Sequence, residues 1–226
     1  MNGVFVGGTD TGVGKTRVAA ALVRALRGAG VRAAGMKPIA AGIEPGCDVN
    51  DDVAALAMAD GLDLPVRIRN PYAFADPIAP HLAARDAGTL IDLRTIAAAA
   101  RVVASRADAI VVEGAGGVRV PVAPGLDMLD LARSLGLPVL LVVGVRLGCL
   151  NHALLSADAV AARGVVLAGW VANRIDPAML RADDNVAELA RLLPAPMLAD
   201  VAWDAAPAFD ARALSRIGVG PAPKAC

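Results

Sequence analysis

One glycine-rich stretch near the start of the chain limits the choice of fold more than any other. Residues 7–16 read GGTDTGVGKT, after the short apolar run of residues 4–6 and before an alanine-rich segment with helical spacing. A strand, a glycine loop and a helix in this order are the context of a P-loop, in which backbone N–H groups and a helix N-terminus bind phosphate. Thr9 stands where the common pattern has glycine, so the loop is a variant.

Two side chains at the end of this loop predict its chemistry. A P-loop lysine supplies positive charge to the phosphates, and the hydroxyl that follows it can hold Mg²⁺. Lys15 and Thr16 occupy these positions. We therefore predict that the chain binds a nucleoside triphosphate. The alternative is a tight strand-to-helix turn in which Lys15 simply faces solvent.

Length and charge exclude several other classes of protein. The 226 residues suffice for one sizeable α/β domain or two small ones. The 22 basic residues balance the 22 acidic ones, so net charge gives no indication of a nucleic acid or an anionic membrane as partner. The longest apolar run, residues 137–145, is well short of the ~20 residues that a membrane span needs. No basic segment followed by an apolar core precedes the first expected strand, so we expect no signal sequence.

Cysteine and histidine are too sparse for a disulfide framework or a zinc site. Cys47, Cys149 and Cys226 are odd in number and far apart, which suits a reducing cytoplasm. His81 and His152 are the only histidines, and there is no CxxC pair. We expect a cytoplasmic protein without structural disulfides or zinc.

Short apolar runs alternate with helical patterns along the whole chain. Strands are expected at residues 4–6, 31–36, 109–112, 138–143, 165–172 and 196–198. Helices are expected at residues 18–26, 51–59, 91–105, 151–161 and 185–193. Apolar strands that alternate with helices predict a parallel sheet covered on both faces. We predict one P-loop NTPase-like α/β domain over residues 1–226, with residues 70–80 as an extended surface connection and a loosely patterned tail after about Pro207.

Polar residues follow directly after several of these strands. Open α/β sheets bind ligands in the crevice beyond the carboxyl ends of their strands, and Lys37, Glu113 and Asn173 stand there. Glu113 is a candidate second metal-holding group near the P-loop, or else it caps its own turn. Asp52 fits the same role, although a carboxylate in a first helical turn is also favoured by the helix dipole. Lys37 either steadies charge on a reacting group or is solvated.

The turn at residues 148–151 is a second candidate anion site. It lies between an apolar strand and a helix, where free N–H groups could capture a carboxylate. The alternative is an ordinary helix N-cap by Asn151. Cys149 and His152 stand close in sequence, but we interpret both side chains as structural. Two side chains at positions i and i+3 of a helix start need not be aligned for catalysis.

The ordered motifs of the chain resemble the dethiobiotin synthetase family, the ATP-dependent cyclo-ligases of biotin synthesis. They cover about nine-tenths of the chain: GTDTGVGKT at 8–16, GMKPIAAG at 35–42, NPYAFADPIAPH at 70–81, VEGAGG at 112–117, LPVLLVVGVRLGCLNHALLSA at 137–157 and LAGWVAN at 167–173. The resemblance implies that 7,8-diaminononanoate takes up CO₂ as a carbamate, which attacks the γ-phosphate of ATP. The second amine then closes the ring, giving dethiobiotin, ADP and phosphate.

The resemblance also implies roles for individual residues. Lys15 would act on the β- and γ-phosphate oxygens, and Lys37 on the carbamate and the transferring phosphoryl group. Mg²⁺ would be held by Thr16, Asp52 and Glu113. The nucleotide would be bound by Gly12, Val13, Gly14, Lys15, Thr16, Arg17, Asp52, Glu113, Gly114, Ala115, Gly116, Asn173, Ala202, Trp203 and Asp204. The substrate would be bound by Thr11, Ala41, Gly148, Cys149, Leu150 and Asn151, the last four donated by the second subunit of a homodimer.

Three positions depart from the family pattern. Ala41 replaces a hydroxyl residue near the diamine, and Ala202 and Phe209 replace a proline and an acidic residue of the adenine segment. Phosphate binding is therefore better specified than base preference.

Other functions of a P-loop protein fit the sequence less well. A partner-regulated ATPase switch of the partitioning type would carry a second lysine where this chain has Asp10. Amidases of the cobyrinate type need a glutaminase part for which 226 residues leave no room. Another small-molecule ligase or a small kinase is the remaining alternative.

Overall fold

A parallel sheet with the strand order β10-β9-β8-β1-β5-β2 runs through the middle of the molecule. The computed structural model describes residues 1–43 and 46–219. The strands of this sheet are β1 (Gly3–Gly8), β2 (Ala33–Met36), β5 (Ala109–Glu113), β8 (Val139–Val145), β9 (Leu167–Arg174) and β10 (Met197–Val201). Because the chain crosses from β1 to β2 on one side and later to β8 on the other, the strand order reverses at β1, which is where such sheets bind ligands.

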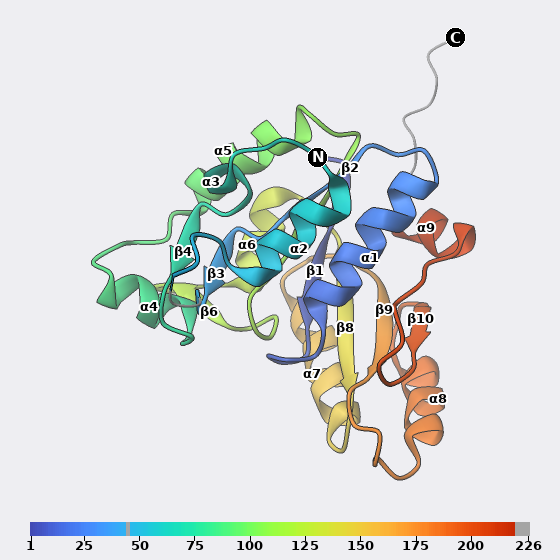
Figure 1. Cartoon of the computed structure of the whole chain (residues 1–226). Coiled ribbons are helices and arrows are strands. Elements are labelled where there is room, and N and C mark those ends of the chain that lie inside the picture. Colours follow the sequence, from blue (N-terminus) through green and yellow to red (C-terminus); the bar gives the residue numbers. More distant parts are fainter. Residues whose placement is uncertain (44–45, 220–226) are drawn as a thin grey trace.

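Helices cover both faces of this sheet, and Figure 1 looks onto the face that carries α1 and α2. The helices are α1 (Lys15–Gly28), α2 (Asp51–Asp60), α3 (Val66–Arg69), α4 (Pro80–Asp86), α5 (Leu93–Ala104), α6 (Met128–Leu135), α7 (Cys149–Ala162), α8 (Ala182–Leu192) and α9 (Ala211–Ile217). Two short sheets stand apart from the main one: β3 (Ile39–Ala41) pairs in parallel with β4 (Tyr72–Phe74), and β6 (Pro121–Ala123) pairs antiparallel with β7 (Leu126–Asp127).

Alternation along the strands builds two hydrophobic cores, one on each face. On β1, Val4 and Val6 pack with α1, α2 and α9, whereas Phe5 packs with α5, α6 and α7 on the opposite face. Every residue of β8 is buried. Strands buried on both faces are apolar throughout, which is why their sequence pattern was clear. The prediction of a parallel α/β sheet covered on both faces is confirmed.

Several short elements were not predicted: α3, α4, α6, α9 and the strands of the two small sheets. Residues 70–80 were expected to form a surface connection, but Tyr72–Phe74 pairs with Ile39–Ala41 and the side chains of Asn70 and Phe74 are buried. A three-residue strand is too short to show a period of two. The three prolines of this segment therefore favoured an irregular connection. The tail after Pro207 forms α9, whose Leu214 and Ile217 pack on the sheet; residues 220–226, with Cys226, lie outside the described residues.

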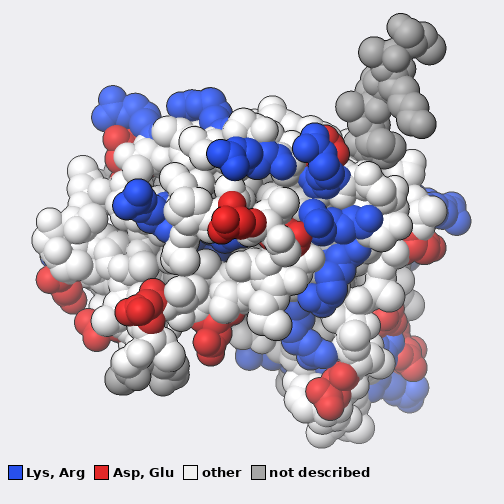
Figure 2. Space-filling view, turned by 45° about the horizontal axis from the view of Figure 1, so that its top comes forward, with Lys and Arg blue, Asp and Glu red and all other residues white. Residues whose placement is uncertain are grey.

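Charged side chains of both signs are spread over the surface in Figure 2, with basic ones in a diagonal run right of the centre. This agrees with the balanced composition. Within the described residues, no helix is both long and apolar enough to span a bilayer. Cys47 is an exposed free thiol and Cys149 a buried one.

The close packing of α2 on β2 gives a test of the fold. A Cβ at Gly35 would lie 2.8 Å from Cβ of Leu56, so Gly35→Ala must push α2 away from the strand. We expect this overpacking to lower the free energy of unfolding by about 1–3 kcal/mol, measured by urea denaturation. Gly28→Ala is the matched control: it meets open space in helix α1 and is expected to add up to about 1 kcal/mol. Equal stability of both variants would contradict this packing.

Candidate active site

The glycine loop between β1 and α1 presents a row of unpaired backbone donors. Gly12 and Gly14 have φ angles of 73° and 86°, in the left-handed region that favours glycine, and Gly14 is the N-cap of α1. A Cβ at Gly14 would come within 2.3 Å of the Nδ2 atom of Asn173, so this residue has no room for a side chain. The N–H groups of residues 12–17 donate to no other described residue. Such a cradle at a helix N-terminus is suited to binding phosphate.

Four predicted side chains from different elements meet beside this loop. The Nζ atom of Lys37 lies 2.5 Å from Oε1 of Glu113 and 2.7 Å from Oδ2 of Asp52. The Thr16 hydroxyl donor lies 2.7 Å from Oδ1 of Asp52 and 2.8 Å from Oε1 of Glu113. Lys37 follows β2, Asp52 opens α2 and Glu113 ends β5. The structure therefore brings together residues that lie up to 97 positions apart.

The helix that carries Asp52 is fixed at its start by a side-chain cap. Asn50 is the N-cap of α2, and its Oδ1 accepts a hydrogen bond of 3.0 Å from the N–H group of Asp52. Its Nδ2 donates to the carbonyl oxygen of Gly42 at 2.9 Å. This cap satisfies one of the free donors of the first helical turn and orients the carboxylate that follows.

Burial and charge shift the protonation equilibria of this cluster. Burial lowers the pKa of Lys15 to about 8, and the nearby charge of Lys37 acts in the same direction. Burial also disfavours the charge on Lys37, but the carboxylates of Glu113 and Asp52 outweigh it and raise the pKa of Lys37. Lys37 is therefore held as a cation at neutral pH, whereas Lys15 stands close to its titration point.

The two carboxylates respond in opposite ways to this environment. Burial raises the pKa of Glu113, although Lys37 and Thr16 partly oppose it. Burial acts in the same sense on Asp52, but the charge and hydrogen bond of Lys37 outweigh it and lower the pKa. Asp52 is thus an anion over the physiological range.

The same oxygen atoms fit a hard divalent cation. Mg²⁺ is usually held by one or two carboxylates together with hydroxyl, water and phosphate oxygens. The Oε2 atom of Glu113 is buried and has no hydrogen-bond partner among the described residues, so one carboxylate oxygen is left for a cation. In the described part of the chain, no three His, Cys, Asp or Glu side chains gather as a metal cluster. A magnesium ion here would use Asp52 and Glu113 together with the hydroxyl of Thr16.

A cavity of about 620 Å³ opens over these groups. Beyond the charged cluster, the predicted residues that line it are Thr11, Gly12, Gly14, Lys15, Arg17, Ala41, Ala115 and Gly116. Gly114 lies behind it, with its carbonyl oxygen 3.4 Å from Nζ of Lys37, and Val13 is buried under the loop. The apolar part of the lining consists of residues 77–80 together with Val120. The residue types of these two segments did not indicate that they line a cavity. Residues 77–80 fall within the motif at 70–81, but Val120 belongs to no motif.

Asp10 organises the first half of the loop. Its carboxylate pairs with Arg146 at 2.5 Å and accepts the N–H group of Thr11 at 2.7 Å. Its carbonyl oxygen accepts a hydrogen bond of 2.9 Å from Nζ of Lys15. The residue that stands in place of a second lysine is therefore an anion with its own cation, a pairing that no local sequence pattern revealed.

The predicted adenine-binding residues lie outside this cavity. Asn173 is the next-to-last residue of β9 and is buried under the loop, where its Nδ2 donates to the carbonyl oxygen of Val13 at 2.8 Å. Trp203 is 56% exposed and Asp204 has a φ angle of 59°. Arg17 connects this segment to α1, because its Nη2 donates to the carbonyl oxygen of Ala205 at 2.7 Å.

The turn before α7 also lies away from the cavity of its own chain. Gly148 is the N-cap of α7, in the left-handed conformation, so the alternative of an N-cap by Asn151 is wrong: the helix begins at Cys149, earlier than expected. The Cys149 side chain is buried and its N–H group donates to the carbonyl oxygen of Arg146. The N–H groups of Leu150 and Asn151 have no acceptor among the described residues. Two backbone donors therefore remain for an anion.

These features together define a class of protein. A glycine loop at a helix N-terminus, a lysine on it, and a hydroxyl and two carboxylates beside it are the parts of a P-loop nucleoside triphosphatase.

Comparison with known proteins then narrows the class to a family. Residues 2–207 match the family model described as an AAA domain. The ATP-dependent dethiobiotin synthetase BioD of Aromatoleum aromaticum is 54% identical over 86% of this chain and 87% of the relative. The enzyme of the same name from Ralstonia nicotianae is 50% identical over 96% and 95%. The chain belongs to the ATP-dependent dethiobiotin synthetase family.

Solved structures of more distant proteins share the fold. The septum site-determining protein MinD of Pyrococcus horikoshii, complexed with Mg-ADP, superposes with a TM-score of 0.56 at 16% identity, over 97% of this chain and 87% of that one. A ParA family ATPase of Chlorobium tepidum gives a TM-score of 0.51 at 15% identity, over 98% and 93%. At this identity the likeness concerns the P-loop fold alone.

The depressed pKa of Lys15 can be measured directly, because the only other lysines in the sequence are Lys37 and Lys224. A neutral amine reacts with a trace of acetic anhydride and an ammonium does not. As the pH rises from 6 to 11, we expect acetylation of Lys15 to increase with a midpoint near 8 and that of Lys37 to increase only at higher pH.

Fragment spectra of the peptides assign each acetyl group to one lysine or to the N-terminal amine. The control is Lys15→Arg, in which the acetylation assigned to position 15 should disappear. A Lys15 midpoint close to the ordinary lysine value of about 10.4 would contradict the described environment.

Proposed function

We propose that this protein catalyses the ATP- and Mg²⁺-dependent carboxylation and ring closure of 7,8-diaminononanoate, giving dethiobiotin, ADP and phosphate. One observation carries the proposal most directly. The ammonium of Lys37 lies 2.5 and 2.7 Å from two carboxylates, on the cavity that the phosphate loop also lines. Membership of the dethiobiotin synthetase family supplies the substrate.

The reaction needs positioning and charge neutralisation more than a protein nucleophile. One substrate amine adds to CO₂ and loses a proton, which gives a carbamate. A carbamate oxygen attacks the γ-phosphorus and ADP leaves, so that a mixed carbamic-phosphoric anhydride forms. The second amine attacks the carbamate carbon and phosphate leaves, which closes the ring. Transfer of a phosphoryl group between bound reactants is accelerated chiefly by alignment and electrostatic stabilisation.

Each charged group of the cavity has a place in this scheme. The free N–H groups of residues 12–17 bind the phosphates, and Lys15 neutralises charge on the β- and γ-oxygens. Lys37 is held as a cation and lies nearest to where the carbamate meets the γ-phosphate, so it stabilises both the carbamate and the transferring group. Bound Mg²⁺, held by Thr16, Asp52 and Glu113, would neutralise charge on the β- and γ-phosphate oxygens.

The lining of the cavity suits a substrate whose hydrocarbon chain separates a diamine from a carboxylate. Residues 77–80 and Val120 offer apolar surface to this chain, and Thr11 and Gly116 lie next to Val120. Ala41 lines the same space without a hydroxyl, so water would take the place of that contact.

The substrate carboxylate would bind at the first turn of α7 in a second subunit. This turn lies away from the cavity of its own chain, and Leu150 and Asn151 have N–H groups without a described acceptor. Leu147 and Leu155 beside it are 90% and 60% exposed, which is unusual for leucine and suits burial in a homodimer.

The nucleotide base would lie beyond β9 and β10. Asn173 uses its Nδ2 on Val13, so its carbonyl oxygen remains to accept from the amino group of adenine. Trp203 offers an exposed ring for stacking. With Ala202 and Phe209 in place of the family residues, we expect weaker discrimination of the base than of the phosphates.

A substrate-dependent assay tests the proposed function. ADP release is measured with ATP, Mg²⁺, bicarbonate and 7,8-diaminononanoate, and again with each omitted in turn. We expect release only with the complete mixture, together with a product of the mass of dethiobiotin. Release that ignores bicarbonate would indicate a kinase, and release that ignores the diamine would indicate an ATPase; both outcomes would contradict the proposal.

Removal of the Lys37 charge should separate binding from chemistry. Lys37→Gln removes the charge but keeps a donor on a side chain one atom shorter, so we expect ADP to bind within about threefold of the wild-type affinity while kcat falls by ~10²–10³-fold, as for loss of one stabilising donor. Calorimetric ADP titration and the assay above measure the two effects. Unchanged turnover would remove Lys37 from the reaction.

A further inference from the structure

No strand of the described residues pairs with the outer edge of β2, and a buried ion pair takes the place of one. β2 is the last strand of the sheet, next to β5. The N–H group of Gly35 donates to Oδ2 of Asp60 at 2.8 Å, and its carbonyl oxygen accepts from Nη1 of Arg69 at 2.8 Å. Side chains therefore satisfy the polar groups that a further strand would otherwise pair.

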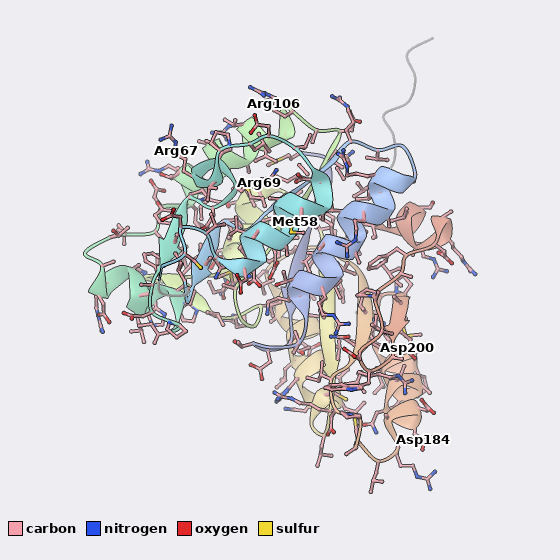
Figure 3. The ribbon with its side chains drawn as sticks, viewed as in Figure 1. Met58, Arg67, Arg69, Arg106, Asp184 and Asp200 are labelled. Atoms are coloured by element: carbon pink, nitrogen blue, oxygen red, sulfur yellow. The ribbon has the colours of Figure 1, made fainter. Side chains whose placement is uncertain are left out.

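The ion pair itself is fully enclosed. Asp60 and Arg69 are each 1% exposed and form two hydrogen bonds to one another, of 2.5 and 2.8 Å. The backbone of Leu62 completes the set, since its N–H group donates to Asp60 and its carbonyl oxygen accepts from Arg69. In Figure 3, Arg69 lies between α3 and α2, whereas Arg67 of the same short helix points away from the ribbon. Such pairs add little net stability compared with apolar residues, so a gain in stability does not account for this one.

The same segment holds both main-chain groups of Lys37. Its N–H group donates to the carbonyl oxygen of Arg69 at 3.0 Å, and its carbonyl oxygen accepts from Nδ2 of Asn70 at 2.7 Å. The second hydrogen of that amide is donated to the carbonyl oxygen of Tyr72 at 2.9 Å. Asn70 is 5% exposed, and both of its donors are used on main-chain oxygens.

Asp60 also connects the strand before Lys37 to the helix that carries Asp52, the carboxylate that Lys37 contacts. Asp52 stands in the first turn of α2 and Asp60 is the last residue of that helix. The bond from Asp60 to Gly35 therefore anchors the helix against the strand that leads into Lys37. Both partners of the ion pair between Lys37 and Asp52 are located by the same group of buried bonds.

We propose that Asp60, Arg69 and Asn70 are positioning residues for Lys37, which fix where its ammonium stands relative to the phosphate loop. The inference rests on the proposed function of Lys37 in phosphoryl transfer. A lysine side chain is flexible, so the position of its Nζ depends on where its main chain is held. A displacement of about 1 Å between reacting groups can reduce a rate by ~10²-fold.

Asn70→Ala tests this proposal, since it removes both donors without adding charge or bulk. We expect kcat for ADP release with the complete mixture to fall by about 10- to 100-fold, while KM for ATP and the ADP affinity stay within about twofold. Acetylation of Lys37, measured relative to Lys15 in the same sample, should increase severalfold because Lys37 is released from its buried position. Unchanged kcat with unchanged acetylation overturns the proposal.

A control of matched stability separates positioning from general damage. Leu189→Ala removes a buried side chain of α8, on the far side of the molecule, and should reduce stability without a selective change at Lys37. If Asn70→Ala lost kcat and ADP affinity in parallel and its lysines reacted as in Leu189→Ala, its role would be structural and the proposal would be wrong.

A second variant covers the case in which Asn70→Ala does not fold. Arg69→Lys keeps the positive charge beside Asp60 but loses the planar fork that donates to Asp60, Gly35 and Leu62. The same selective loss of kcat is expected, and full activity in this variant counts against the proposal. If the wild-type protein forms no dethiobiotin, the proposed function fails, but the acetylation of Lys37 still decides whether these residues position it.

Discussion

The ion pairs between Lys37 and the carboxylates of Asp52 and Glu113 are the interaction on which the rest of the site depends. A lysine this deeply buried keeps its charge only where anions compensate for lost hydration, and the buried carboxylate of Glu113 likewise needs the ammonium. Since the three residues come from β2, α2 and β5, the pairs also fix how these elements stand together. The requirement for compensation thus connects the stability of this half of the molecule to the chemistry proposed for it.

Much of the fold could be predicted from the sequence because its strands are buried on both faces. Residues 139–145 form an apolar run that is typical of a central strand. The glycine loop predicted the strand before it and the helix after it. The missed elements are all short, and the longest of them, α6, has eight residues. β4 has three residues, and α9 has seven, of which three are buried. Segments of this length show too few repeats of a period, so tertiary contacts decide their structure.

The candidate site also contains residues that could be predicted from the sequence and residues that could not. Residues within a motif or directly after a strand, such as Thr16, Lys37 and Glu113, could be placed together because parallel strands end at one edge. The pairing of Asp10 with Arg146 could not, since 136 positions separate two residue types that are common on any surface. The apolar wall was also hidden, because an apolar side chain gives no sign of which space it faces.

The packing of Gly14 against Asn173 has a consequence for how the site can change in evolution. This contact joins the phosphate loop to β9, so the groups expected to meet the base belong to one side of the sheet, with β8, β9 and β10. Lys37 and Asp52 belong to the other side, with β5, β2 and α2. Substitutions that change the preference for the nucleotide base can therefore occur on one side of the sheet. They need not alter Lys37 and Asp52, the groups proposed for phosphoryl transfer on the other side. Within the sheet of the described residues, the two halves are joined through β1, which pairs with β5 on one side and with β8 on the other.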